Sequence, residues 1–178
     1  MILRPWESVE PKDALDFYTR NREHLAPWEP LRADSFFTLD HHLEARQLGE
    51  LERLNGRAYS YAVMAGRHLA GRASLSDVTR GVFQSAYIGY LTDAAMLGRG
   101  VATKAVSELL HLAFYDLGLH RVQAAVMPSN AASLRVVEKT GFSRIGVSPR
   151  YLYINGAWED HVLYAITIED LAARSSQI

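Results

Sequence analysis

A glycine-rich turn between a strand and a helix constrains the fold of this chain more than any other segment. Alternating aromatic and aliphatic residues predict a strand at 86–91. The segment 97–102 reads Leu-Gly-Arg-Gly-Val-Ala, and after it an apolar stripe at helical spacing runs to Gly118. Glycines let backbone N–H groups point toward an anion, which the dipole of the following helix also favours. The turn is therefore either a diphosphate site or a tight connection that needs positive φ.

The part of the chain before this turn predicts two helices and a hairpin. Apolar residues at helical spacing indicate helices over 11–24 and 38–54, and two prolines make 25–30 a rigid aromatic loop between them. The period then changes to two, which predicts a hairpin over 57–75.

The part after the turn predicts one more helix and three more strands. Asn130 is a good N-cap, and Asn155-Gly156 is the strongest short hairpin signal. The polar tail after Ile168 is expected to fray. The predicted elements are a strand at 121–127, a helix at 130–139 and strands within 143–154 and 157–167.

Length and composition predict one domain over residues 1–178, built from mixed α and β layers. The chain has 178 residues, of which 48% are hydrophobic and 22% charged. Because 19 Lys and Arg oppose 20 Asp and Glu, direct nucleic acid binding is not expected. The sequence shows no apolar run of membrane-spanning length and no signal-peptide layout at its start, so we expect a cytoplasmic protein that binds no membrane.

The chain has no cysteine, which excludes disulfides, thiolate metal sites and a cysteine nucleophile. Its seven histidines lack metal-ligand spacing, and no metal is predicted. His41 and His42, on a polar helix face, are expected to be solvated.

Two common nucleotide motifs do not fit the glycine turn. A Rossmann fingerprint needs a third glycine near position 103, where Thr103 stands, and an acidic residue in the strand at 121–127, which has none. A Walker loop needs Gly-Lys-Ser/Thr, which is also missing.

The turn instead resembles the acetyl-coenzyme A motif of the GNAT superfamily of N-acetyltransferases, Gln/Arg-x-x-Gly-x-Gly/Ala. Gly100 and Ala102 match its last two positions, whereas Leu97 replaces the usual Gln or Arg. The segment from Asn130 to Gly141-Phe142 is similar to the strand-helix unit that follows in the family. Segments 21–25, 27–30, 87–90 and 155–162 resemble the RimJ and RimL branch, which acetylates N-terminal α-amines of ribosomal proteins.

The resemblance implies a GNAT fold: a central, mostly antiparallel, splayed sheet with helices on both faces. It also implies acetyl-coenzyme A as cosubstrate, with the pantetheine arm along the open edge of the splayed strand and the diphosphate on the turn. The implied cofactor-binding residues are Tyr90, Leu91, Thr92, Leu97, Gly98, Arg99, Gly100, Val101, Ala102, Thr103, Asn130 and Ser133.

The catalytic acid is implied by the branch rather than by the wider family. Many GNAT enzymes carry a Tyr seven residues after the motif Asn, but this chain has Val137 there. The RimJ and RimL branch has a Ser three residues after the Asn, which Ser133 matches. A hydrogen bond from Ser133 to the leaving thiolate is the functional reading, and a plain helix position for Ser133 is the alternative.

The attacking amine must lose its proton first. An α-amine has a pKa of about 7.7–8.0 and needs only slight help, whereas a lysine amine has about 10.4. Glu29 on the rigid loop is the first candidate base and Asp160 the second, although either can be a simple surface carboxylate. RimL-like relatives carry an acidic residue just before the Tyr that aligns with Tyr151, whereas this chain has Arg150 at that position. The expected acceptor pocket is formed by Trp28, Glu29, Tyr87, Tyr151, Tyr153 and Asp160, whose aromatic members can equally be packing residues.

Three functions follow from these features. The first is acetylation of a protein N-terminus, and the second is acetylation of a small amine such as an antibiotic or a polyamine. The third is a non-catalytic acyl-coenzyme A binding module, which the departures at Leu97 and Val137 would explain. The sequence is compatible with a monomer or a homodimer.

Overall fold

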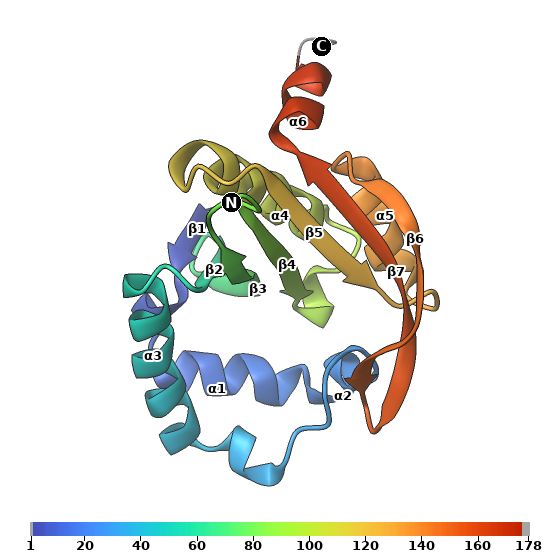
Figure 1. The fold of residues 1–178 in the computed structure, drawn as a ribbon. Coiled ribbons are helices and arrows are strands. Elements are labelled where there is room, and N and C mark those ends of the chain that lie inside the picture. Colours follow the sequence, from blue (N-terminus) through green and yellow to red (C-terminus); the bar gives the residue numbers. More distant parts are fainter. Residues whose placement is uncertain (1, 176–178) are drawn as a thin grey trace.

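The computed structural model describes residues 2–175, which form one continuous sheet with helices packed against it (Figure 1). The strands are β1 (Ile2–Pro5), β2 (Tyr59–Ala65), β3 (His68–Thr79), β4 (Ser85–Thr92), β5 (Arg121–Val126), β6 (Ser143–Ile154) and β7 (Ala157–Thr167). The α-helices are α1 (Pro11–Arg20), α2 (Arg22–Leu25), α3 (Leu39–Leu54), α4 (Val101–His111), α5 (Ala131–Lys139) and α6 (Ile168–Ser175).

The sheet has the order β1-β2-β3-β4-β5-β7-β6, and every neighbouring pair except β4 and β5 is antiparallel. The parallel pair β4 and β5 joins only Ser85–Tyr87 to Arg121–Gln123, and the two strands then diverge. The predicted mixed α/β fold with a mostly antiparallel, splayed sheet is confirmed.

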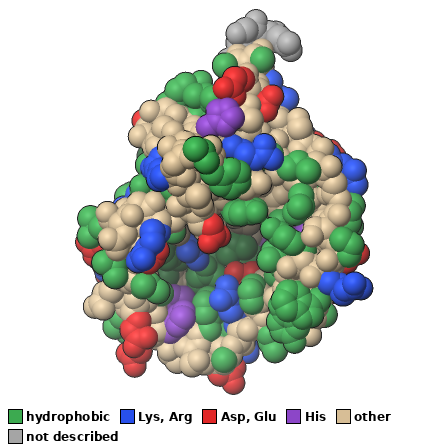
Figure 2. Space-filling view, in the orientation of Figure 1, with side chains coloured by type: hydrophobic (Ala, Val, Ile, Leu, Met, Phe, Trp, Pro, Cys, Tyr) green, Lys and Arg blue, Asp and Glu red, His purple; other side chains and the backbone are tan. Residues whose placement is uncertain are grey.

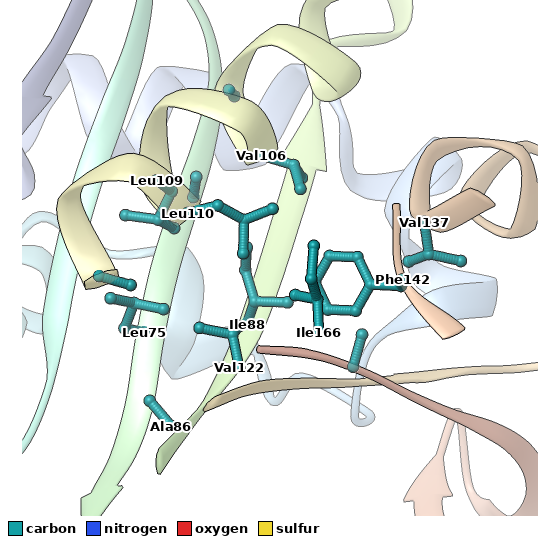
Figure 3. Packing of buried hydrophobic residues seen from close by; sticks show 14 of the residues in the cluster. Leu75, Ala86, Ile88, Val106, Leu109, Leu110, Val122, Val137, Phe142 and Ile166 are labelled. Carbon is teal, nitrogen blue, oxygen red and sulfur yellow. The ribbon is translucent and has the colours of Figure 1, made fainter. Parts of the chain in front are cut away.

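Alternate residues of the central strands feed two separate cores, one on each face of the sheet. Val63, Leu75 and Ile88 pack with α4 and α5 in the larger core (Figure 3). Ala62 and Leu69 pack on the opposite face with Trp6 and with apolar residues of α1 and α2. Helices therefore cover both faces of the sheet. The gap between the diverging strands β4 and β5 lies between these two layers of helices.

The predicted helix over 11–24 is interrupted at Asn21, which separates α1 from α2. The Asn21 side chain is completely buried; its Nδ2 donates to the Phe17 carbonyl at 2.9 Å, and its Oδ1 accepts from the Ala94 N–H at 2.8 Å. Asn21 therefore ties the end of α1 to the segment that follows β4.

The helix predicted over 38–54 is confirmed as α3, but its packing differs from expectation. All five of its leucines are exposed, whereas His42, which we expected in solvent, is buried at 4% exposure. The His42 ring stacks on Tyr18 of α1 at 5.6 Å between centroids. The His42 side chain is buried because it packs against the face of the Tyr18 ring. The prediction that His42 is solvated was therefore wrong.

The tail after Ile168 does not fray at its start, because residues Ile168–Ser175 form α6. The Thr167 N–H donates to the Asp170 carboxylate at 2.9 Å, and the Asp170 N–H donates to Thr167 Oγ1 at 3.3 Å. This reciprocal cap is a helix-start signal, and it corrects the sequence prediction for 168–175. In residues 2–175 no helix combines the length and hydropathy needed to cross a membrane.

Candidate active site

The opening between β4 and β5 defines the candidate site. Beyond Tyr87, the edge of β4 that faces β5 has no strand partner, so Ile88–Thr92 present free backbone groups toward the gap. The space-filling view shows the molecule hollowed near the end of β4, above α1 and beside the β6–β7 hairpin (Figure 2). An extended ligand arm could add to this edge through main-chain hydrogen bonds, as an extra strand would.

A side-chain hydrogen bond spans the open end of the gap. The hydroxyls of Tyr90, on β4, and Ser133, on α5, lie 2.6 Å apart. The Ser133 N–H donates to Asn130 Oδ1 at 3.0 Å, so Asn130 caps the helix that carries the serine. Sequence analysis placed Tyr90, Asn130 and Ser133 in one site, and the structure brings the three together.

The Tyr90 hydroxyl is a donor at neutral pH. Burial raises the pKa of Tyr90 to about 12, against a smaller opposing effect of the hydrogen bond with Ser133. A protonated Tyr90 can donate to Ser133 Oγ, and the serine then keeps its own proton for another acceptor. Such a pair suits protonation of a leaving group on the β4–β5 gap.

The glycine turn is exposed, and its backbone conformation suits an anion site. Gly98 and Gly100 have φ of 71° and 73°, and α4 begins at Val101 with no side-chain cap. The N–H groups of the first helical turn, from Val101 to Thr103, have no acceptor within the helix. A Cβ at either glycine would meet nothing within 4 Å, so the turn is accessible. The residues present fit a diphosphate.

An aromatic group lies on the other face of β4 from Tyr90. Tyr151 on β6 donates a long hydrogen bond to the Tyr87 hydroxyl on β4, with 3.4 Å between the oxygens. That bond, reinforced by burial, raises the pKa of Tyr151 to about 12. The His161 ring on β7 meets the edge of Tyr151 at 5.7 Å. This group, Tyr87, Tyr151 and His161, joins the two halves of the sheet.

Comparison with known proteins agrees with this geometry. Residues 1–143 match the family model described as the Acetyltransferase (GNAT) domain. The chain belongs to the GNAT acetyltransferase family. It is 36% identical to the probable N-acetyltransferase YjcK of Bacillus subtilis, over 96% of this chain and 95% of that protein. It is 31% identical to the [ribosomal protein uS5]-alanine N-acetyltransferase of Escherichia coli, over 91% and 86% respectively.

A solved structure extends the likeness to the whole fold. Mycobacterium smegmatis RimJ in complex with CoA-disulfide superposes with a TM-score of 0.88 at 32% identity, over 98% of this chain and 87% of that one. A shorter match is the aminoglycoside N(6')-acetyltransferase type 1 of Klebsiella pneumoniae, 33% identical over 51% of this chain and 43% of that protein. The GNAT chain is thus an acetyl-coenzyme A-dependent N-acetyltransferase, and the resemblance to the RimJ branch is confirmed.

The predicted acceptor residues of this GNAT enzyme fall into separate places. Glu29 and Trp28 lie by the β6–β7 turn, where the Asn155 N–H donates to the Glu29 carbonyl at 2.9 Å. The Glu29 carboxylate, 12% exposed, pairs with Arg32 at 3.1 Å and borders a cavity of about 110 Å³ that Tyr18 and Phe36 also line.

Two other predicted residues point away from the aromatic group. Tyr153 is half-exposed and contacts Trp158 near the end of the hairpin, with 5.5 Å between the rings. Asp160 accepts the Arg150 N–H at 2.8 Å, where Arg150 has a positive φ of 49°. Asp160 thus holds a bulge in β6.

Sequence reasoning missed His161, the neighbour of Asp160. Val162, Tyr164 and Ile166 of β7 belong to the larger core, so alternation along the strand directs His161 to the other face. That alternation was a usable signal, because the apolar period is visible in the sequence. No cluster of potential metal ligands occurs among residues 2–175.

Proposed function

We propose that this GNAT enzyme transfers the acetyl group of acetyl-coenzyme A to the α-amine at a protein N-terminus, of the ribosomal-protein type, by direct attack in a ternary complex. The observation that carries the proposal is the Tyr90–Ser133 pair at the open end of the β4–β5 gap. Similarity over 91% of this chain, at 31% identity, to a protein named as a ribosomal-protein alanine N-acetyltransferase supports this acceptor class.

Acetyl-coenzyme A supplies the activated acyl group. In the proposal its diphosphate lies on the N–H groups of the turn from Gly98 to Thr103, which includes the Arg99 backbone. The pantetheine arm follows the free edge of β4 through Tyr90, Leu91 and Thr92. Leu97 is half-exposed at the start of the turn, so its replacement of a polar residue removes a side chain and leaves the backbone donors in place.

Ser133 acts in this proposal as the hydrogen-bond donor to the departing sulfur. The Tyr90 and Ser133 hydroxyl oxygens lie 2.6 Å apart, and in this proposal Tyr90 is the donor, which leaves the serine hydrogen free for the sulfur. A thiol has an ordinary pKa of about 8.5, so its thiolate is already a fair leaving group, and one hydrogen bond lowers the barrier further. Asn130 fixes the position of Ser133 through the helix cap.

The acceptor enters from the face that carries the aromatic group. Glu29, held by Arg32 at the mouth beside the hairpin, offers a carboxylate that can attract an ammonium group. Trp28 and Tyr151 supply apolar walls in this proposal, whereas Tyr153, which contacts Trp158 near the end of the hairpin, does not. An N-terminal amine fits the site chemically, because about a tenth of an α-amine is already neutral at pH 7. The proposed setting is the cytoplasm, and a monomer or a homodimer is compatible with it.

Acetylation of a small amine is the second candidate, and the aminoglycoside acetyltransferase match favours it. That match covers 51% of this chain, whereas the ribosomal-protein relative covers 91%. The wider match spans nearly the whole chain, whereas the aminoglycoside acetyltransferase match spans about half of it. We therefore rank the protein N-terminus first.

An acceptor panel tests the proposal. The purified protein is mixed with acetyl-coenzyme A and peptides that begin with free Ala or Ser, and thiol release is measured. The same peptides with a blocked N-terminus are the matched controls, and lysine peptides, polyamines and aminoglycosides complete the panel. We expect release with free N-termini only. Faster turnover of a polyamine or an aminoglycoside than of every peptide would contradict the proposed acceptor.

A further inference from the structure

His161 stands where the proposed reaction needs a proton acceptor. It comes from β7, and its ring contacts Tyr151, whose hydroxyl reaches Tyr87 on β4. Ser133 approaches the same gap from α5, through its bond to Tyr90. Tyr87 and Tyr90 are three residues apart on one strand and point to opposite faces. A group in the gap would therefore have the serine on one side and the histidine cluster on the other.

The hydrogen bonding of His161 fixes its neutral tautomer. The side chain is buried at 3% exposure, and Nδ1 lies 3.0 Å from the Glu159 carbonyl oxygen. A carbonyl oxygen only accepts, so Nδ1 carries the hydrogen and Nε2 holds the lone pair of the neutral ring. The ring is thus oriented by the backbone of its own strand, as catalytic imidazoles often are.

The Nε2 atom of His161 has no hydrogen-bond partner among residues 2–175. The buried side-chain nitrogens that are fully sealed from solvent without a partner in this part of the chain belong to His42, Arg53 and Arg72, and Nε2 of His161 is not one of them. An oriented imidazole with an unpaired Nε2 lone pair has the form of a general base.

We propose that Nε2 of His161 accepts the proton of the attacking amine, directly or through one water. The assignment rests on the proposed acetyl transfer. The ammonium group loses one proton to Nε2, and the lone pair of the resulting neutral amine forms the N–C bond with the thioester carbonyl. The nitrogen then gives its second proton to water as the C–S bond breaks. The leaving sulfur takes its electron pair with a hydrogen bond from Ser133, and the imidazolium returns its proton to water.

The groups around the ring are compatible with this role. Two residues of β6 lie beside His161: Tyr151 contacts the His161 ring, and Ser148 is opposite His161 in the strand register. Tyr87 on β4 and the more distant Asp77 act on Tyr151, whose raised pKa keeps it neutral at physiological pH. The carboxylate of Asp160 is turned away to the Arg150 N–H. The tyrosine that the His161 ring contacts is therefore neutral at physiological pH.

The test compares His161→Gln with His111→Gln. His111 also packs on a tyrosine, with 4.5 Å to the Tyr115 ring, but it lies on α4 at the end far from the glycine turn. Coenzyme A affinity is measured by calorimetry, and turnover is measured against pH with whichever amine the acceptor panel finds fastest. Using the fastest amine separates the proposed acceptor from the proposed role of His161. If that amine is a small molecule, the proposed acceptor is contradicted, but the role of His161 is still tested.

For His161→Gln we expect a coenzyme A Kd within about twofold of wild type and a kcat lower by roughly 10²-fold near neutral pH. The deficit should shrink above about pH 8, where an α-amine deprotonates by itself. His111→Gln should behave as wild type. In His161→Ala, added imidazole should restore part of the rate. A wild-type pH profile in His161→Gln, or an equal deficit at every pH without rescue by imidazole, would overturn the assignment.

Discussion

Substitution of Gly100 by alanine isolates the contribution of the turn to coenzyme A binding. Gly100 has φ of 73°, and a Cβ there would meet nothing within 4 Å, so the change adds backbone strain without a steric clash. An L-residue in this conformation costs about 1–2 kcal/mol. Residues 97–100 are exposed, so we expect the free variant to relax by rotating the N–H groups of the turn away.

Coenzyme A must then restore the strained turn when it binds. A cost of about 1–2 kcal/mol corresponds to roughly a five- to thirtyfold weaker Kd, since about 1.4 kcal/mol is a factor of ten. Isothermal titration of coenzyme A into wild type and Gly100→Ala measures this ratio. Turnover under saturating cofactor should change much less, because the thioester lies away from the turn.

Gly66→Ala is the matched control. Gly66 also has positive φ, 63°, and open space around its Cβ position, but it lies in the β2–β3 turn. Strain that the folded state retains lowers Tm by about 2–4 °C per kcal/mol in a chain of this size. The control should lose stability and keep the wild-type Kd. Gly100→Ala with an unchanged Kd would refute the role given to the turn amides.

Three further changes give separate expectations. Ser133→Ala should lower kcat by roughly 10²-fold and leave the coenzyme A Kd nearly unchanged; wild-type turnover would remove Ser133 from the mechanism. Asn21→Ala leaves the part-buried Ala94 N–H without its acceptor and should cost about 1–3 kcal/mol in urea unfolding; an unchanged stability would contradict this role of Asn21. Burial, with smaller effects of His41 and Arg72, lowers the pKa of His42, so stability should fall as pH drops through about 6.5, where the unfolded state takes up the proton first. His42→Phe should flatten that slope, and an identical slope would contradict the assignment.

Local patterns predicted the elements that carry the cofactor site. Period-two strands, the Asn155-Gly156 turn and the two glycines at positive φ are short-range signals, and the structure follows them. Asn130 was recognised as a cap from its own sequence context, and the cap bond to Ser133 exists.

Contacts between distant segments determine the features that local sequence patterns did not predict. The break at Asn21 depends on the Ala94 N–H, 73 residues away along the chain. His42 is buried because Tyr18 offers a ring face, which helical periodicity does not show. The hydroxyl pair of Tyr90 and Ser133 joins a strand to a later helix, and neither residue signals the other locally.

A crystal structure of the coenzyme A complex shows directly where the cofactor binds. We expect the diphosphate on the N–H groups of residues 98–103, the pantetheine arm against β4 from Ile88 to Thr92, and the sulfur within hydrogen-bond reach of Ser133 Oγ. A cofactor bound elsewhere, with the β4–β5 gap empty and the Tyr90–Ser133 pair untouched, would contradict this expectation.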